Sequence, residues 1–187
     1  RFMKGEFSMW EKDIDINQVV EIRTRTNVYF GVGAIKKIDD IVKTLKTKGI
    51  DKVIVMSGRN AYKATGAWDY VEKALKDNGV GYINYDQVTP NPTTVHVNEA
   101  AKMARDFGAK AVIAIGGGSP TDAGKSVAIL LEYPEKTAEN IYDFEFAPEK
   151  AAPIVSINLT HGTGTETNRF AVVTNLEKNF KPAIAYD

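Results

Sequence analysis

The sequence predicts an open α/β fold in which helices cover both faces of a mainly parallel sheet. Three observations support this prediction. Short runs rich in β-branched residues alternate with longer amphipathic stretches, glycines follow several of those stretches, and the best-defined short runs are apolar at nearly every position. Strands buried on both faces have such continuous apolar runs, and strands separated by helices imply right-handed βαβ crossovers.

The first predicted elements lie between residues 19 and 48. Val19 to Phe30 alternates enough to predict a strand or hairpin, and Ala34 to Lys48 has the amphipathic spacing of a helix. Residues 1–18 are expected to form a leader or N-terminal arm, with Met9 a candidate natural start. No apolar core follows the basic residues at the beginning, so a secretory signal is not expected.

Two strand–helix cycles follow. Val53 to Met56 predicts a buried strand, and Ala67 to Asp77 predicts a helix. Val80 to Tyr85 predicts the next strand, and a second helix is expected from Thr94 to Phe107, closed by Gly108.

The clearest buried strand is Ala111 to Ile115, which runs directly into a glycine loop and a further helix. Pro153 to Asn158 predicts another strand, and Pro182 to Asp187 predicts a last one that leads into a second domain. The arrangement is that of an open, Rossmann-like α/β domain over residues 19–187, although the GxGxxG fingerprint of a standard Rossmann fold is missing.

The candidate ligand-binding segment is GGGSPTDAGKS, residues 116–126, because ligands of open α/β sheets bind outside the carboxyl ends of the strands. Glycines let the backbone approach a ligand closely. We expect Ser119 to cap the next helix, with Pro120 at its first position and Asp122 at the capping-box position. The amides at that helix end would bind a pyrophosphate. A strand-to-helix turn without a ligand explains the same residues.

A P-loop is the competing interpretation of this segment. Gly124-Lys125-Ser126 matches the end of that motif, but the residue five positions before Gly124 is Ser119 instead of glycine. Pro120 would also remove an amide from the phosphate cradle. The spacing therefore disfavours a nucleotide triphosphatase.

Four segments, in this order along the chain, resemble the iron-containing alcohol dehydrogenase family. Tyr29 to Ala34 is similar to its early FGxGA segment, and Val88 to Thr93 to its PNPT loop. GGGSPTDAGKS is similar to its GGGSxxDxAK signature, with Gly124 where alanine is usual. Thr160 to Glu166 resembles its TxGTGSE segment. Together the four segments make a specific match.

The resemblance implies an N-terminal α/β domain that binds a nicotinamide dinucleotide and a C-terminal helical domain that holds Fe²⁺ or Zn²⁺. The cofactor contacts that it implies are Gly117, Gly118 and Ser119 at the pyrophosphate, Asp122 near the nicotinamide ribose, Asn91 at the nicotinamide end, and Thr160, Thr163 and Lys181 along the cofactor. Ordinary loop hydrogen bonds would also explain the threonines, and a solvated charge would explain the lysine.

The residues after the first buried strand bear on which dinucleotide binds. Relatives that use NAD tend to carry Asp at the position of Gly58, where a carboxylate would bond the ribose 2′-hydroxyl and repel a 2′-phosphate. Ser57, Arg59 and Asn60 can instead donate hydrogen bonds to that phosphate. We therefore expect NADP, with NAD as the alternative and an ordinary surface turn as the interpretation without a ligand.

No metal site and no catalytic residue are assigned within the chain. The two histidines, His96 and His161, have no partner at a metal-ligand spacing, and there is no cysteine. By resemblance, the metal ligands are expected beyond Asp187, so the C-terminal domain is absent from this chain.

We expect the NADP(H)-binding half of an enzyme that interconverts alcohols and aldehydes or ketones by hydride transfer, inactive by itself. A glycerol- or propanediol-type polyol dehydrogenase half, or a non-catalytic self-associating fragment, remains an alternative.

Composition limits the other partners. The 24 basic residues balance the 24 acidic ones, so neither nucleic acid nor an anionic membrane is an expected partner. No apolar run reaches the roughly 20 residues of a membrane-spanning helix. The absence of cysteine suits a cytoplasmic protein, and a homo-oligomer acting on a small alcohol or aldehyde is expected.

Overall fold

The computed structural model describes residues 19–23 and 26–186, which belong to two compact units, residues 1–37 and 38–187. In the first unit, β1 (Val20–Arg23) pairs antiparallel with β2 (Asn27–Phe30), and the 3-10 helix η2 (Ala34–Lys37) follows. The predicted strand or hairpin is thus a hairpin. The leader or arm predicted over residues 1–18 lies outside the described residues.

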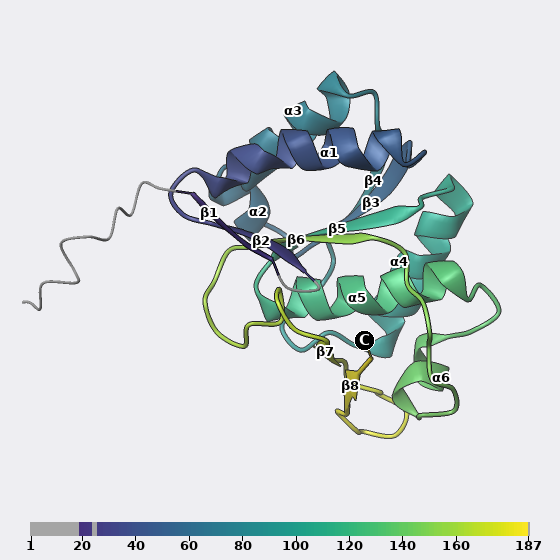
Figure 1. Cartoon of the computed structure of the whole chain (residues 1–187). Coiled ribbons are helices and arrows are strands. Elements are labelled where there is room, and N and C mark those ends of the chain that lie inside the picture. Colours follow the sequence, from purple (N-terminus) through teal and green to yellow (C-terminus); the bar gives the residue numbers. More distant parts are fainter. Residues whose placement is uncertain (1–18, 24–25, 187) are drawn as a thin grey trace, which may run out of the picture. The chain divides into compact units, whose positions relative to one another are not determined.

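The second unit is built on a parallel sheet of four strands in the order β4-β3-β5-β6 (Figure 1). This confirms the predicted Rossmann-like sheet, and the predicted strands agree with the observed ones to within one residue at either end. The strands are β3 (Lys52–Ser57), β4 (Gly81–Tyr85), β5 (Ala111–Gly116) and β6 (Ile154–Asn158).

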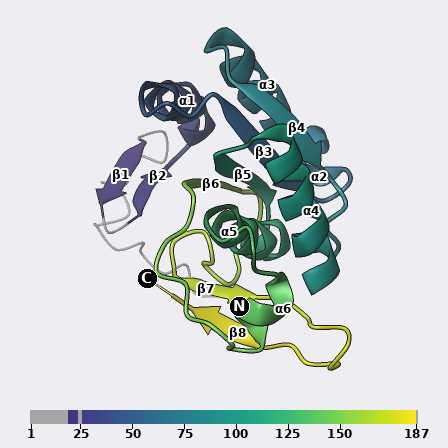
Figure 2. The same ribbon diagram turned by 90° about the vertical axis from the view of Figure 1, so that its right-hand side faces the viewer.

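Helices cover both faces of this sheet, as predicted. Helices α1 and α3 pack on one face, and α4 and α5 pack on the other (Figure 2). The helices are α1 (Ile38–Thr47), α2 (Ala61–Ala64), α3 (Ala67–Asp77), α4 (Thr94–Phe107), α5 (Gly118–Glu132) and α6 (Ala138–Tyr142).

The side chains of β5 show why the strand is apolar at every position. Val112 and Ala114 pack into the core under α4 and α5, whereas Ile113 and Ile115 pack into the core under α1 and α3. Successive side chains of a strand point to opposite faces, so a strand covered on both sides needs apolar residues throughout. This central strand then carries the glycine loop at its carboxyl end.

The last strand turns back onto the same unit. β8 (Ala183–Ala185) pairs antiparallel with β7 (Phe170–Val172), and Ile184 is buried in the core that α4 and α5 share. The strand predicted from Pro182 onward therefore contributes to the packing of this unit.

Helix α5 begins earlier than the sequence predicts. Its N-cap residue is Gly117, with φ −86° and ψ −153°, so Ser119 and Pro120 lie inside the first turn. The predicted cap at Ser119 and the predicted capping box with Asp122 are therefore wrong. Thr160 packs so closely on Gly117 that a side chain there would clash, and the Asp122 carboxylate instead accepts hydrogen bonds from Thr165 Oγ1 and Val172 N.

Helix α4 begins with a capping box. Thr93 Oγ1 accepts a hydrogen bond from His96 N at 3.4 Å, and His96 Nδ1 accepts one from Thr93 N at 3.0 Å. We expect Thr93→Ala to lower the free energy of unfolding in urea by about 1 kcal/mol. Thr44→Ala, at an exposed position within α1, should change it by less than about 0.5 kcal/mol. Equal effects of the two variants would contradict the capping role.

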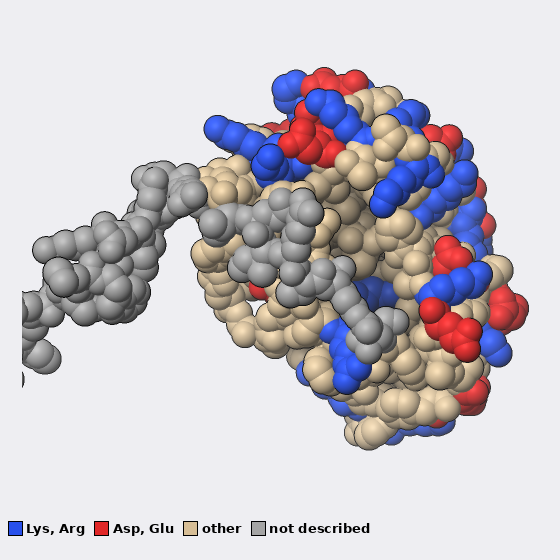
Figure 3. Space-filling view, viewed as in Figure 1, with Lys and Arg blue, Asp and Glu red and all other residues tan. Residues whose placement is uncertain are grey.

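Charges of both signs share the surface. Lys and Arg side chains are interspersed with Asp and Glu on the right-hand side of the face in Figure 3. Some pair one helical turn apart, such as Lys43 with Asp39 at 2.6 Å. Within residues 19–23 and 26–186, no helix has the length and apolar content needed to cross a membrane.

Candidate functional site

β3 and β5 are adjacent in the sheet, and the connections that follow them lead to strands on opposite sides of this pair. β3 leads through α3 to β4 on one side, and β5 leads through α5 to β6 on the other. Ligands of open α/β sheets bind in the crevice at such a switch in strand order. Ser57 pairs with Ile115, so the segments that begin at Gly58 and Gly117 leave the sheet at the same end, where the parallel strands finish.

Gly116, Gly117 and Gly118, which we call the glycine loop, allow contacts at the end of β5 that a side chain would prevent. A Cβ on Gly116 would lie 2.6 Å from Pro120 Cγ, and a Cβ on Gly117 would lie 2.5 Å from Thr160 Oγ1. Real Cβ atoms essentially never approach so closely. The second contact shows that the loop after β6 lies directly against the glycine loop.

The same loop also contacts Gly118. A Cβ there would lie 3.3 Å from Thr163 Oγ1 and 3.8 Å from Thr165 Cγ2. The structure therefore brings five of the predicted cofactor residues together at the start of α5. The predicted ones are Gly117, Gly118, Ser119, Thr160 and Thr163.

The amino end of α5 suits an anion. The helix has 15 residues, no side chain within the described part of the chain caps it, and its first turn contains no acidic residue. Unpaired amides and the helix dipole favour negative charge at such an end. Thr121 Oγ1 bonds the Gly117 carbonyl at 3.1 Å and contacts Ser156 Oγ at 3.0 Å, which links the first turn to β6.

Asp122 and Lys125 project from α5 toward the loop after β6. Asp122 accepts from Thr165 Oγ1 and from Val172 N, the latter at 3.1 Å. Burial is the main influence on both charged groups: it raises the pKa of Asp122 and lowers the pKa of Lys125. Hydrogen bonds and nearby positive charges oppose the shift in the pKa of Asp122, and the negative charges of Asp122 and Glu166 oppose the shift in the pKa of Lys125.

A cavity of about 460 Å³ lies where β3 and β4 end. Arg59 is exposed at its edge, whereas Ser57 is only 1% exposed and does not line it. A Cβ on Gly58 would lie 3.2 Å from the Val88 carbonyl oxygen, so a side chain would need that backbone to yield slightly. The lining residues are Gly58, Arg59, Asn60, Ala61, Val88, Thr89 and Pro90.

Asn91 and Lys181 are brought into contact across the fold. Lys181 Nζ donates to Asn91 Oδ1 at 2.5 Å, and Asn91 has a positive φ of 58°. The loop that carries Asn91 is fixed by two backbone bonds, from Thr174 N to the Pro92 carbonyl and from Thr94 N to the Thr174 carbonyl. Two side chains that the resemblance assigned to the cofactor thus lie together.

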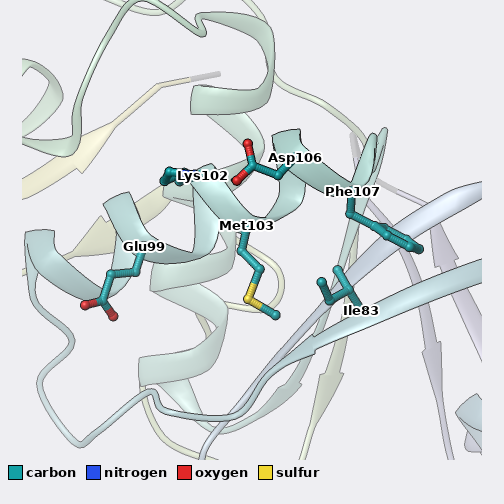
Figure 4. Close-up of a pocket in the computed structure, with 6 residues that line it drawn as sticks. All are labelled: Ile83, Glu99, Lys102, Met103, Asp106 and Phe107. Atoms are coloured by element: carbon teal, nitrogen blue, oxygen red, sulfur yellow. Dashed lines mark hydrogen bonds and ion pairs between the residues drawn. The ribbon is translucent and has the colours of Figure 1, made fainter.

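A second hollow, of about 510 Å³, lies between α4 and the edge strand β4 (Figure 4). Its charged side chains already have partners: Glu99 accepts from Tyr85, and Lys102 pairs with Asp106. The remaining lining residues, Ile83, Met103 and Phe107, are apolar. Because it has no convergent polar groups, this hollow is a weaker candidate site than the strand ends.

The histidines lie apart from any cluster of metal-ligating residues. His96 forms the capping box of α4, and His161 is exposed in the loop after β6. Within the described part of the chain, no three His, Cys, Asp or Glu residues form a group that could hold a metal ion.

Sequence reasoning missed the roles of Lys125 and Thr165. Lys125 falls at the lysine of both the P-loop and the GGGSxxDxAK motif and was assigned no contact, whereas its Nζ donates to carbonyl oxygens of the loop after β6. Both residues lie inside segments that carried the resemblance, so those motifs were the available signal. Their contact joins positions 40 residues apart, which no local pattern predicts.

Comparisons with known proteins give a consistent match. A family model described as iron-containing alcohol dehydrogenase matches residues 25–187. The chain is 60% identical over 179 residues to a long-chain primary alcohol dehydrogenase, AdhA, of Thermoanaerobacter ethanolicus, covering 96% of this chain and 45% of that protein. It is 34% identical over 161 residues to an NADPH-dependent butanol dehydrogenase of Clostridium saccharobutylicum, covering 85% of this chain and 40% of that protein.

A solved structure has the same fold. An NADH-dependent butanol dehydrogenase A of Thermotoga maritima superposes with a TM-score of 0.75 at 33% identity, over 81% of this chain and 38% of that one. The chain therefore spans less than half the length of these relatives.

Proposed function

The chain belongs to the iron-containing alcohol dehydrogenase family, and from this membership we propose that it forms the NADP(H)-binding part of a metal-dependent alcohol dehydrogenase. The metal-binding part is proposed to lie outside these 187 residues, so the chain alone would bind the dinucleotide without turning over an alcohol. The 60% identity to a long-chain primary alcohol dehydrogenase makes primary alcohols the first substrates to test with a longer protein that contains this chain.

The geometry of the strand ends supports a dinucleotide lying across the switch in strand order. The uncapped amino end of α5 would hold the pyrophosphate through backbone amides, including those of Gly118 and Ser119. Thr160 and Thr163, which lie against the glycine loop, would border the same phosphates. The cavity beside Gly58 would hold the adenosine ribose, on the adjacent strand end.

The other end of the dinucleotide would face Asn91, Lys181 and Asp122. Asn91 and Lys181 are held together by a hydrogen bond, and the half-buried Asp122 is within electrostatic range of Lys181. When bound, the dinucleotide supplies a nicotinamide ring that accepts or donates a hydride. The residues of this chain would orient that ring, and they are assigned no proton-transfer step.

The preference for NADP(H) rests on one observation, the cavity beside Gly58. Its lining contains no acidic residue, and it includes the Arg59 guanidinium and the Asn60 amide. An Arg fork makes charge-assisted bonds to a phosphate, whereas a carboxylate would repel it. Since the relatives include both an NADPH-dependent and an NADH-dependent enzyme, local residues must decide the preference.

Titration of the chain with NADPH and with NADH, followed by nicotinamide fluorescence, tests this proposal. We expect tighter binding of NADPH. Arg59→Ala should weaken NADPH binding about tenfold or more, because a hydrogen bond to a charged group contributes about 1.5–3 kcal/mol. The same variant should leave NADH binding within about twofold, since NADH lacks the 2′-phosphate.

Lys43→Ala is the matched control, since Lys43 is also an exposed cation but lies on α1 and does not line the cavity. It should leave both affinities unchanged. A preference for NADH, or equal losses of both dinucleotides in Arg59→Ala, would reject the assignment to NADP. Binding of neither dinucleotide would reject the proposed site as a whole.

A further inference from the structure

The ammonium group of Lys125 is surrounded by oxygen atoms of the loop between β6 and β7. Nζ donates to the carbonyl oxygens of Thr165, Asn168 and Phe170, the last two at 2.7 and 2.8 Å, and it lies 2.8 Å from Thr165 Oγ1. An ammonium group has three N–H donors for these four oxygens, so all three donors are used and one is shared between two oxygens. The lysine therefore binds the loop at several points along its course.

Thr165 links Lys125 to Asp122. Its hydroxyl accepts from Lys125 Nζ and donates to Asp122 Oδ1, while Asp122 Oδ2 accepts from Val172 N at 3.1 Å. Two side chains one turn apart on α5 thus bind the segment 165–172 at both of its ends. Thr165 is 3% exposed, so this linkage lies largely out of contact with water.

The loop that Lys125 binds is the loop that covers the glycines. Thr160 lies against Gly117, and Thr163 lies against Gly118 (Figure 1 shows the loop passing around the amino end of α5). Residues 159–169 contain no helix and no strand, so regular backbone pairing does not fix their position. Side-chain bonds from α5 must supply much of that constraint.

The bonds of Lys125 differ from those of a surface lysine. Lys43 pairs with Asp39 one turn away on an exposed face of its own helix, and such pairs contribute little. Lys125 is half-buried, and its partners lie 40 to 45 residues further along the chain. Loss of its ammonium group would remove this donor from three carbonyl groups, of which that of Phe170 also accepts from Thr165 Oγ1 at 3.1 Å.

We propose that Lys125 is a positioning residue for the dinucleotide: it holds Thr160 and Thr163 against Gly117 and Gly118 and so sets the affinity for the pyrophosphate without touching it. This inference rests on the proposed function. Adenosine binding at the cavity beside Gly58 does not depend on this loop, because no residue of the loop lines that cavity.

The test compares Lys125→Met with Lys178→Met. Lys178 pairs with Asp143 at 2.7 Å, and its variant therefore also removes an ammonium group and an ion pair, but away from the glycine loop. Two probes are titrated. The first is the dinucleotide, NADPH or NADH, that binds the unmodified chain more tightly. The second is its adenosine fragment, which lacks the pyrophosphate: adenosine 2′-monophosphate for NADPH, or adenosine for NADH. Lys125→Met should weaken dinucleotide binding about tenfold or more and change fragment binding less than about twofold. Lys178→Met should change neither.

A pair of conservative variants removes the linkage without removing the lysine. Thr165→Val deletes the hydroxyl while nearly keeping the shape, and Thr165→Ser keeps the hydroxyl. We expect Thr165→Val to weaken dinucleotide binding several-fold, and Thr165→Ser to bind the dinucleotide as tightly as the unmodified chain. This pair carries the test if circular dichroism shows that Lys125→Met does not fold.

Several results would overturn the proposal. Equal dinucleotide affinities of Lys125→Met and Lys178→Met would do so, and so would equal losses of dinucleotide and fragment, which indicate a general loss of folded protein. Equal affinities of Thr165→Val and Thr165→Ser would show that the hydroxyl linkage does not matter. If the unmodified chain binds neither NADPH nor NADH, the proposed function fails first and this inference fails with it.

Discussion

Gly116→Ala is expected to lower the free energy of unfolding by about 3 kcal/mol, the upper end of the usual cost of overpacking. The added Cβ would lie 2.6 Å from Pro120 Cγ, with Pro120 Cβ and Cδ at 3.2 and 3.3 Å. A proline ring is closed onto the backbone, so it cannot rotate away as a flexible side chain would. Either the end of β5 or the first turn of α5 must move.

Urea unfolding followed by circular dichroism measures this effect, with two controls. Gly162→Ala changes a glycine in the facing loop where no heavy atom lies within 4 Å of the new Cβ, and it should stay within about 0.5 kcal/mol of the unmodified chain. Gly116→Ala combined with Pro120→Ala should recover the part of the loss that the proline ring causes and leave the strain of an alanine at φ 157°. If the double variant is as unstable as the single one, Pro120 is not the cause.

Most of the fold could be predicted because its signals are local. β5 is apolar at every position and ends in glycines, and α4 has an amphipathic stretch closed by Gly108. A strand buried on both faces is apolar throughout, and a helix buried on one face is amphipathic, so both patterns can be recognised without knowing which distant residues they contact. The amino end of α5 was predicted wrongly because Ser119 followed by Pro120 is a common capping pattern, whereas the helix begins at Gly118, beside a contact of Gly117 with the distant Thr160.

The site was harder to predict because its contacts join distant segments. The hydrogen bond between Lys181 and Asn91 spans 90 residues, and resemblance to a family suggested both residues while their contact was not foreseen. The bonds of Lys125 to the loop after β6 were missed for the same reason, since no spacing within α5 indicates which carbonyl groups its ammonium will meet. Local pattern predicts which elements form, and only the folded chain shows which loops they bind.

Gly58→Asp should reverse the cofactor preference. The new carboxylate would stand in the cavity beside Arg59, where it would repel a 2′-phosphate and accept a hydrogen bond from a free ribose 2′-hydroxyl. Repulsion between like charges about 4 Å apart at a protein surface amounts to a few kcal/mol, so we expect NADPH affinity to fall about 100-fold. NADH affinity should rise by up to about tenfold, because the carboxylate would form one charge-assisted bond to the ribose. Crowding reduces this gain, since the new Cβ would lie 3.2 Å from the Val88 carbonyl oxygen.

Gly58→Asn separates the charge from the crowding, because its side chain has nearly the same shape and no charge. Fluorescence titration of both variants with NADPH and NADH therefore gives two differences, one for the added atoms and one for the added charge. If Asn and Asp weaken NADPH binding equally, the Val88 carbonyl causes the effect and the cavity does not select by charge. If Gly58→Asp weakens NADPH binding and Gly58→Asn does not, the absence of a carboxylate at position 58 is what allows the 2′-phosphate to bind.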